Sequence, residues 1–382
     1  MQKGGYSAHA GYCFNMTDPV SRFTPFSGSY PHTYFAGANT ADGFLSAYPD
    51  FIREEELAAL FIIKGGSGTG KSSLMKACAA HAASRGASVT LLLCSSDPSS
   101  ADAVLLTGKN GVRAALLDGT PPHSVDPLLP GAVGEIVNVG DYWDGARLAA
   151  RREEIAFLTA AKRAAYARAN RFLAAGQQLN QERRALLAPC ILHDKLNASV
   201  RRLLASCKRE QHPAEHIRHV YALSMTGAYH LTTLSRRAGQ HVTVLDRYGT
   251  AEIWLNALRA EARRLAIPAE IEAAPVCPRD AWGVFLPGAG LFAALAPAGN
   301  TESSGKTVNM QRFLDRSALA GCRARLRFAA RCRDMLLDGA LDALREAGKA
   351  HFALEELYRD AMDFDGVSQE TRRICARLDA LW

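Results

Sequence analysis

The pattern of apolar and polar segments predicts a chain in which strands and helices alternate. An apolar run at 57–64 has the length of a buried strand and leads through a glycine-rich stretch into a helical segment at 71–84, which Gly86 ends. Further apolar runs at 89–94 and 112–117 predict two more strands. Strands that alternate with helices are typical of a parallel α/β sheet.

A different pattern occupies residues 146–187. Apolar positions recur at intervals of three to four and seven residues and predict one long amphipathic helix; they are Ile155, Leu158, Ala165, Phe172, Leu179 and Leu186. Pro189 ends this helix, and a second helix is expected at about 195–208. We expect the two helices to form a helical hairpin over about 145–211 that projects between two α/β units.

The second half of the chain repeats the first. Segment 61–77 aligns with 243–258, and segment 137–144 aligns with 308–315. Three shorter matches occur in the same order: His32-Thr-Tyr with His219-Val-Tyr, Gly68-Thr69 with Gly249-Thr250, and the Cys-x-x-Asp of Cys94–Asp97 with that of Cys277–Asp280. Matches in one order at similar spacing indicate an internal duplication. We therefore expect one domain at 1–212, which includes the hairpin, and a second at 213–382.

Composition places the chain among ordinary globular proteins. Its 382 residues exceed the usual size of one domain, and 48% are hydrophobic and 22% charged. No apolar run approaches the roughly 20 residues that span a bilayer, so no membrane partner is expected. The nine cysteines are scattered without a CxxC pair, and the first residues lack a signal-peptide pattern. These features predict a cytoplasmic protein with reduced thiols.

Positive charge is concentrated in the predicted hairpin. Between Gly145 and Gln211 there are fourteen Lys or Arg against five Asp or Glu, whereas the whole chain has a formal net charge of +7. Such a segment would attract an acidic partner or a nucleic acid. It lacks the interleaved aromatic residues of a single-strand platform, and a solvated arginine-rich helical face is the simpler interpretation.

The glycine-rich stretch carries the clearest chemistry. It matches the P-loop pattern G-x-x-x-x-G-K-[ST] between a predicted strand and a predicted helix; the residues are Gly65, Gly66, Ser67, Gly68, Thr69, Gly70, Lys71 and Ser72, followed by Ser73. Glycines let backbone N–H groups surround phosphates at the positive end of a helix. We expect Lys71 to reach the β- and γ-phosphates of ATP and the Ser72 hydroxyl to bind Mg²⁺.

Three further residues are candidates for this site. Asp118 follows four apolar residues, as the carboxylate that holds a magnesium-bound water does in such enzymes. Asp97 follows the strand at 89–94 and would contact the nucleotide or a phosphate acceptor, although an Asp before Pro98 also suits a plain turn. His123 would sense the γ-phosphate or orient water, although a loop histidine is more often structural.

In the alignment of the two repeats, the second repeat lacks the phosphate-binding lysine and the magnesium-binding serine. There, Glu252 takes the place of Lys71 and Ile253 that of Ser72, which removes both the cation and the metal ligand. We expect the second repeat not to bind nucleotide in the manner of the first.

The chain resembles an uncharacterised bacterial family of tandem P-loop ATPases. The resemblance rests on segments 32–44, 64–76, 94–97, 116–127 and 130–144, and it continues more weakly through the second half. It implies ATP binding and hydrolysis, with a P-loop in each copy, and the second copy departs from that pattern here. The fold class predicted is α/β, with two tandem P-loop NTPase-like parallel-sheet units and long helical extensions.

Three functions fit these observations. The first is a magnesium-dependent ATPase that acts as a switch between its active and degenerate repeats. The second is a small-molecule or nucleotide kinase, with Asp97 at the acceptor and with Arg147, Arg151 and Arg152 of a helical lid on the phosphates. The third is a nucleotide-gated module that binds a nucleic acid or a protein. No guanine-reading motif N/T-K-x-D is present, which favours ATP over GTP.

Overall fold

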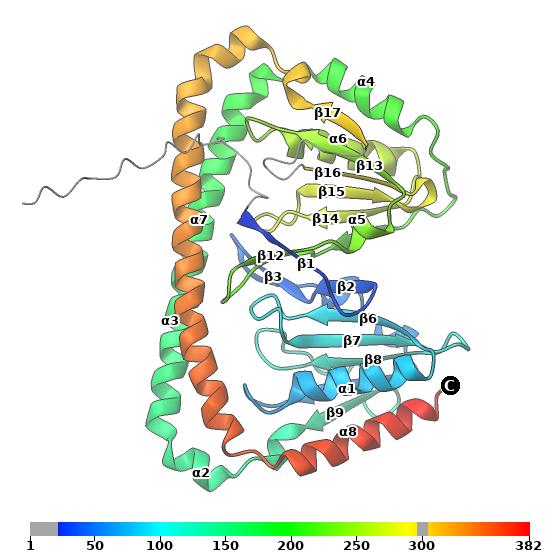
Figure 1. Cartoon of the computed structure of the whole chain (residues 1–382), viewed down its shortest axis with the longest axis vertical. Helices are drawn as coiled ribbons and strands as arrows, with labels where there is room; N and C mark the ends of the chain where they lie inside the picture. The colour runs from blue at the N-terminus through cyan, green and yellow to red at the C-terminus, as the bar shows by residue number, and fades with distance from the viewer. Residues whose placement is uncertain (1–21, 296–304) are drawn as a thin grey trace, which may run out of the picture.

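The computed structural model describes residues 22–295 and 305–382, which form two α/β units beside a pair of long helices (Figure 1). The first unit contains a six-stranded sheet and helix α1 (Lys71–Ser84). Its strands are, in spatial order, β2 (His32–Phe35), β6 (Ser88–Leu93), β7 (Ala101–Thr107), β8 (Arg113–Asp118), β5 (Ala59–Lys64) and β9 (Gly134–Asn138). The predicted strands β5, β6 and β8 and the helix α1 are confirmed.

The second unit repeats this topology strand for strand. Its sheet consists of β10 (Glu215–Arg218), β14 (Ala269–Ala273), β15 (Ala281–Leu286), β16 (Leu291–Leu295), β13 (Gln240–Leu245) and β17 (Lys306–Asn309), with α6 (Ala251–Arg264) after β13. Each pair of neighbours has the same relative direction as its counterpart in the first sheet. A shared six-strand order with shared directions supports the duplication read from the sequence.

Both sheets are mixed, whereas the sequence predicts parallel ones. In the first unit β7 runs antiparallel to β6 and to β8, and β15 does the same in the second. The apolar segment of β7 was not recognised as a strand. It is joined to β6 by a short turn, and that connection makes an antiparallel neighbour rather than a parallel crossover.

Short strands join the two units. β3 (Gly37–Thr40) pairs with β4 (Gly43–Ser46), and in the second unit β11 (Tyr221–Leu223) pairs with β12 (Ala228–Leu231). Strand β1 (Thr24–Phe26), from the start of the described chain, pairs with β12. Helix α5 (Thr233–Arg237) follows β12 in the chain. The Phe35 amide donates to the His219 carbonyl oxygen at 2.8 Å, so equivalent ends of the two repeats meet.

The long helices α3 (Arg152–Leu187) and α7 (Arg316–Arg359) pack along each other in opposite directions and span both units (Figure 1). The short helix α2 (Gly145–Ala150) precedes α3, and the side chains of Asp144 and Asp315 cap the N-termini of α2 and α7. Each helix buries an apolar stripe against the other. Gly339 permits close approach, because a Cβ there would lie 3.3 Å from the Phe172 ring.

The predicted helical hairpin over 145–211 is wrong, because α3 pairs with α7 and not with α4 (His193–Leu204). Helix α4 packs on α6 of the second unit, whereas α8 (Phe364–Asp379), at the end of the chain, returns to pack on α1 of the first. Each repeat therefore supplies a helix that covers the other repeat's unit. The apolar stripe of α3 is satisfied by α7, which leaves α4 free to cover α6.

Candidate functional site

The loop between β5 and α1 is shaped by three glycines. Gly65, Gly68 and Gly70 have φ values of 158°, 72° and 85°, which L-residues with a side chain rarely adopt. Gly68 is also in close contact with α7, because a Cβ there would lie 2.4 Å from the Glu355 carbonyl oxygen. The loop therefore lies at the carboxyl end of β5, at the N-terminus of α1 and beneath the C-terminal part of α7.

Lys71 closes over this loop. Its ammonium group donates to the carbonyl oxygens of Gly65 at 2.9 Å and Gly66 at 2.6 Å, and it lies 3.5 Å from Asp118 Oδ2. The Lys71 and Asp118 side chains are only 11% and 14% exposed. A largely buried cation and carboxylate thus meet at the ends of the adjacent parallel strands β5 and β8.

Asp118 is held by the turn that follows β8. Its Oδ1 accepts from the Thr120 amide at 2.9 Å and from the Thr120 hydroxyl at 2.5 Å, which leaves Oδ2 directed at Lys71. Burial raises the pKa of Asp118, while the Lys71 ammonium and the Thr120 hydrogen bonds oppose the increase. The carboxylate is therefore positioned by one oxygen and available through the other.

Side-chain hydroxyl groups come from the loop and from the first turn of α1. Ser72 Oγ accepts from the Ala101 amide at 2.8 Å, which ties α1 to the start of β7 and leaves the hydroxyl proton and a lone pair for a ligand. Thr69 is buried and its hydroxyl donates to the Gly66 carbonyl oxygen at 2.9 Å. Ser67 and Ser73 border a cavity that lies in front of the loop.

The two loop candidates lie beside this cavity in different surroundings. Asp97 accepts from the Ser99 amide at 3.1 Å and the Ser99 hydroxyl at 2.8 Å, the pattern of a turn former. His123 is buried with both ring nitrogens engaged: Nδ1 lies 3.0 Å from Ser46 Oγ, and Nε2 lies 3.3 Å from Asp102 Oδ2. The predicted role of His123 as a direct sensor of phosphate or water is not favoured by this geometry.

Asp102 is a site residue that the sequence reasoning missed. It is the second residue of β7, the strand that was not predicted, and it borders the cavity with Lys71 and Asp118. An acidic residue at the start of the apolar run 103–106 was the available signal.

The cavity in front of the loop has a volume of about 1170 Å³ and is bordered by both long helices. Its outer wall consists of Thr159, Lys162, Arg163, Tyr166 and Asn170 from α3 and His351, Leu354, Glu355, Tyr358 and Arg359 from α7. Burial lowers the pKa of Lys162, and a hydrogen bond from His351 lowers that of Glu355. The lid cations expected from the sequence are Arg147, Arg151 and Arg152, whereas the structure places Lys162 and Arg163 at the cavity.

At the described positions that correspond to Lys71, Ser72 and Asp118, the second unit has different residues. Strand register places Leu295 where the first unit has Asp118, because Ile63 pairs with Asp118 and Val244 with Leu295. The loop of the second unit is one residue shorter, since Leu245 matches Lys64 and α6 begins at Ala251. The sequence alignment was therefore displaced by one residue.

The helix starts then give the true counterparts of Lys71 and Ser72. Ala251 stands at the position of Lys71, and Glu252, not Ile253, stands at that of Ser72. The buried residues of the two helices agree with this match, because Leu74 and Met75 correspond to Trp254 and Leu255.

The Cys-x-x-Asp match was also displaced. Cys94 donates its amide to the Ser100 carbonyl oxygen, and the same bond in the second unit runs from Ala274 to Asp280. Cys94 therefore corresponds to Ala274 and not to Cys277. By the paired strands, Ala101 corresponds to Ala281, so Trp282 stands where the first unit has Asp102.

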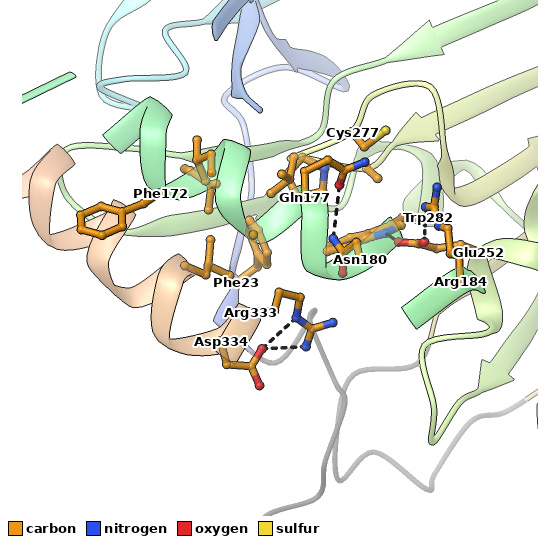
Figure 2. Close-up of a pocket in the computed structure, with 17 residues that line it drawn as sticks. Phe23, Phe172, Gln177, Asn180, Arg184, Glu252, Cys277, Trp282, Arg333 and Asp334 are labelled. Atoms are coloured by element: carbon orange, nitrogen blue, oxygen red, sulfur yellow. Dashed lines mark hydrogen bonds and ion pairs between the residues drawn. The ribbon is translucent and has the colours of Figure 1, made fainter. Parts of the chain in front are cut away.

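Side chains fill the second site (Figure 2). Glu252 accepts from Trp282 Nε1 at 2.8 Å and from Arg184 of α3 at 2.6 Å, and Arg184 also reaches Asp280 at 2.5 Å. The cavity that remains has a volume of about 60 Å³. Arg333 and Asp334 of α7 close one side of it, as Figure 2 shows.

Comparison of the chain with protein families, curated proteins and solved structures finds no match. Within residues 22–295 and 305–382, no group of three or more His, Cys, Asp or Glu side chains is arranged to hold a metal ion. No helix in the same described ranges is long and apolar enough to cross a membrane.

Proposed function

We propose that this protein binds Mg²⁺–ATP at the loop 65–70 and hydrolyses it, as one of two tandem P-loop units of which the second is inactive. The observation that carries the proposal is the approach of Lys71 to Asp118, 3.5 Å apart at the ends of adjacent parallel strands and facing a cavity of about 1170 Å³. A glycine loop, a helix N-terminus and a buried cation together form a strong site for a polyphosphate.

The donor groups suit magnesium. Mg²⁺ prefers hard oxygen ligands and is usually held by one or two carboxylates together with substrate phosphates and water. The Ser72 hydroxyl and the Asp118 carboxylate supply two such oxygens at the cavity. When bound, the ion would neutralise charge on the β- and γ-phosphates, and Ser72 and Asp118 would hold it directly or through water.

The remaining residues would bind and orient the nucleotide. Backbone amides of the loop would donate to the phosphates, and Lys71 would exchange its carbonyl partners for phosphate oxygens. Lys162 from α3 would bring a second cation to the triphosphate, because it borders the same cavity. The two long helices border the cavity and would reduce the access of water to it, which strengthens each of these charge interactions.

The inactive repeat fits a switch. Helices α3 and α7 each contact both sites, so a change at the first site has a rigid route to the second. Glu355 of α7 lies at the active loop, and Arg184 of α3 lies at the inactive one. Nucleotide contacts that move α7 relative to the loop would therefore shift how α3 packs in the second unit.

A kinase is the second candidate, and the size of the cavity favours it. Its volume of about 1170 Å³ exceeds the roughly 300–1,000 Å³ of most ligand pockets. The space reaches Asp97 as well as Lys162 and Arg163, so it has room for an acceptor beside the nucleotide. Nucleic-acid binding has less support, because basic residues of 145–211 such as Arg168, Arg184 and Arg201 pair with carboxylates of the chain.

The test is ATP turnover with Mg²⁺ by wild-type protein, Lys71→Ala and Asp118→Asn. We expect phosphate release from the wild type and a loss of at least about 100-fold in both variants. If ADP formed only when candidate phosphate acceptors were added, the result would favour the kinase over the ATPase. Wild-type protein that neither binds nor turns over ATP would reject the proposal.

A further inference from the structure

Two carboxylates lie close together where the central strands β7 and β8 of the first sheet reach the cavity. The paired register of the antiparallel strands β7 and β8 ends with Ala103 opposite Leu117, and Asp102 and Asp118 are the next residues on the two strands. One donor, the Tyr48 hydroxyl, binds both of their backbone carbonyl oxygens, at 2.8 Å and 3.1 Å. The two like charges repel each other, and besides burial the Asp102 charge contributes to the raised pKa of Asp118, so the stability of the sheet gives no reason for this pair.

The Asp102 carboxylate is buried and lacks a full set of partners. The residue is 6% exposed, and among the described residues its Oδ2 has no hydrogen bond of normal geometry. His123 Nε2 lies 3.3 Å from that oxygen. Burying a carboxylate without partners costs several kcal/mol, roughly, unless a ligand uses it. Asp102 borders the same cavity as Lys71, which is where such a ligand would lie.

The His123 ring is fixed in place with its Nε2 atom directed at the Asp102 carboxylate. The ring stacks on Tyr48 with centroids 4.3 Å apart, and Phe44 contacts its edge at 4.8 Å. Its Nδ1 lies 3.0 Å from Ser46 Oγ, so the opposite nitrogen is aimed at Asp102. A histidine fixed on one nitrogen and directed at a carboxylate by the other orients that carboxylate.

The inactive repeat supplies an internal comparison. At the positions of Lys71, Ser72 and Asp118 it has Ala251, Glu252 and Leu295, and Asp102 is replaced there by Trp282. The carboxylate of Asp102 has thus been lost together with the three groups that define the phosphate site.

We propose that Asp102 is the general base of ATP hydrolysis and that His123 is the residue that positions it. This inference rests on the proposed ATPase function. The oxygen of a water molecule would form a bond to the γ-phosphorus while the bond from the γ-phosphorus to the β,γ-bridging oxygen breaks. The water proton would pass to the Asp102 carboxylate, and ADP would leave with the bonding electron pair. The proton then returns to solvent as phosphate departs.

The first experiment compares Asp102→Asn with wild type for ATP affinity and for kcat. We expect kcat to fall by at least about 100-fold, as for loss of a general base, with the Kd for Mg²⁺–ATP within about threefold. The variant should unfold at the same or a higher urea concentration, because it removes a repulsive pair. Asp342→Asn, at a solvent-exposed pair on α7, is the matched control and should retain full kcat.

The second experiment tests positioning through His123. His123→Phe keeps a ring for stacking on Tyr48 but has no donor for Asp102, whereas His123→Gln keeps a donor. We expect His123→Phe to lose about tenfold or more in kcat at unchanged ATP affinity, and His123→Gln to recover most of that loss. Equal losses in the two variants would overturn the positioning role.

The outcomes separate this inference from the function on which it rests. A kcat of Asp102→Asn within threefold of wild type, with Lys71→Ala inactive, would overturn the role of Asp102 and leave the ATPase intact. Absence of phosphate release from the wild type would overturn both.

Discussion

The Arg184 guanidinium of the first repeat lies 2.6 Å from the Glu252 carboxylate of the second. Arg184 precedes Ile191 by seven residues, and Glu355 precedes Met362 by the same interval; Ile191 and Met362 form equivalent bridges, to Leu314 and Trp143. Arg184 and Glu355 are therefore counterparts on the two long helices. The site of the first unit has a lysine in its first helical turn and an acid from the long helix, whereas that of the second unit has an acid in the first turn and an arginine from the long helix.

Removing Arg184 should destabilise the protein. Arg184→Ala would leave Glu252 and Asp280 facing each other without their shared cation, at a cost of about 2 kcal/mol in the free energy of unfolding. Arg325→Ala, which breaks an exposed pair with Glu182, should cost less than about 0.5 kcal/mol. Urea denaturation of both variants measures the difference. Equal effects would show that the Arg184 contact is no more than a surface ion pair.

Gly68 should tolerate a methyl group less well than a glycine of similar backbone conformation. Gly68→Ala and Gly131→Ala both place a side chain at positive φ, which costs about 1–2 kcal/mol. Only at Gly68 would the new Cβ also meet α7, 2.4 Å from the Glu355 carbonyl oxygen; at Gly131 nothing lies within 4 Å. We expect Gly68→Ala alone to weaken ATP binding, by tenfold or more in a titration. Unchanged affinity would mean that α7 yields freely.

The exchange of helices between units predicts where mutations act. Ile374 of α8 is fully buried, and Ile374→Ala should cost about 3 kcal/mol in the free energy of unfolding. Because α8 packs on α1, amide hydrogen exchange should accelerate in residues 71–84 of the first unit. Val200→Ala in α4 should accelerate exchange in α6 instead. If Ile374→Ala accelerated amide hydrogen exchange in α6 and left α1 unaffected, the assignment of α8 to the first unit would be contradicted.

Stability should fall on mild acidification through His219. This side chain is 3% exposed, and burial lowers its pKa to about 4. The unfolded chain binds a proton near the ordinary histidine value of 6.5, so the neutral folded form loses stability as the pH falls from about 6.5 to about 4. The loss from this group approaches about 3 kcal/mol.

The measurement is the free energy of unfolding in urea at pH 7 and at pH 4.5, for wild type and His219→Gln. We expect a smaller pH dependence in the variant. Burial also lowers the pKa of His32 and of His216, so part of the slope should remain. An identical slope in both proteins would show that His219 is protonated without cost.

The sequence by itself determined the local features of the candidate site. The glycine loop, the helix 71–84 and the strands that end at Lys64 and Asp118 follow from apolar runs and glycine positions, which act over a few residues. Parallel strands align their carboxyl ends, so the approach of Asp118 to Lys71 could be anticipated. The duplication was also visible, although its alignment was displaced at Ser72, at Cys94 and at His32, whose counterpart by strand register is His216 and not His219.

Tertiary structure decided what lies farther away in the chain. Asp102 reaches the site because β7 inserts antiparallel between β6 and β8, and strand pairing is a non-local choice that periodicity leaves open. Lys162 and Glu355 come from two helices that are far apart in the chain, and only tertiary packing brings α3 and α7 together. The same choice sent α4 and α8 to opposite units, because a helix is covered by whichever apolar surface the completed fold brings to it.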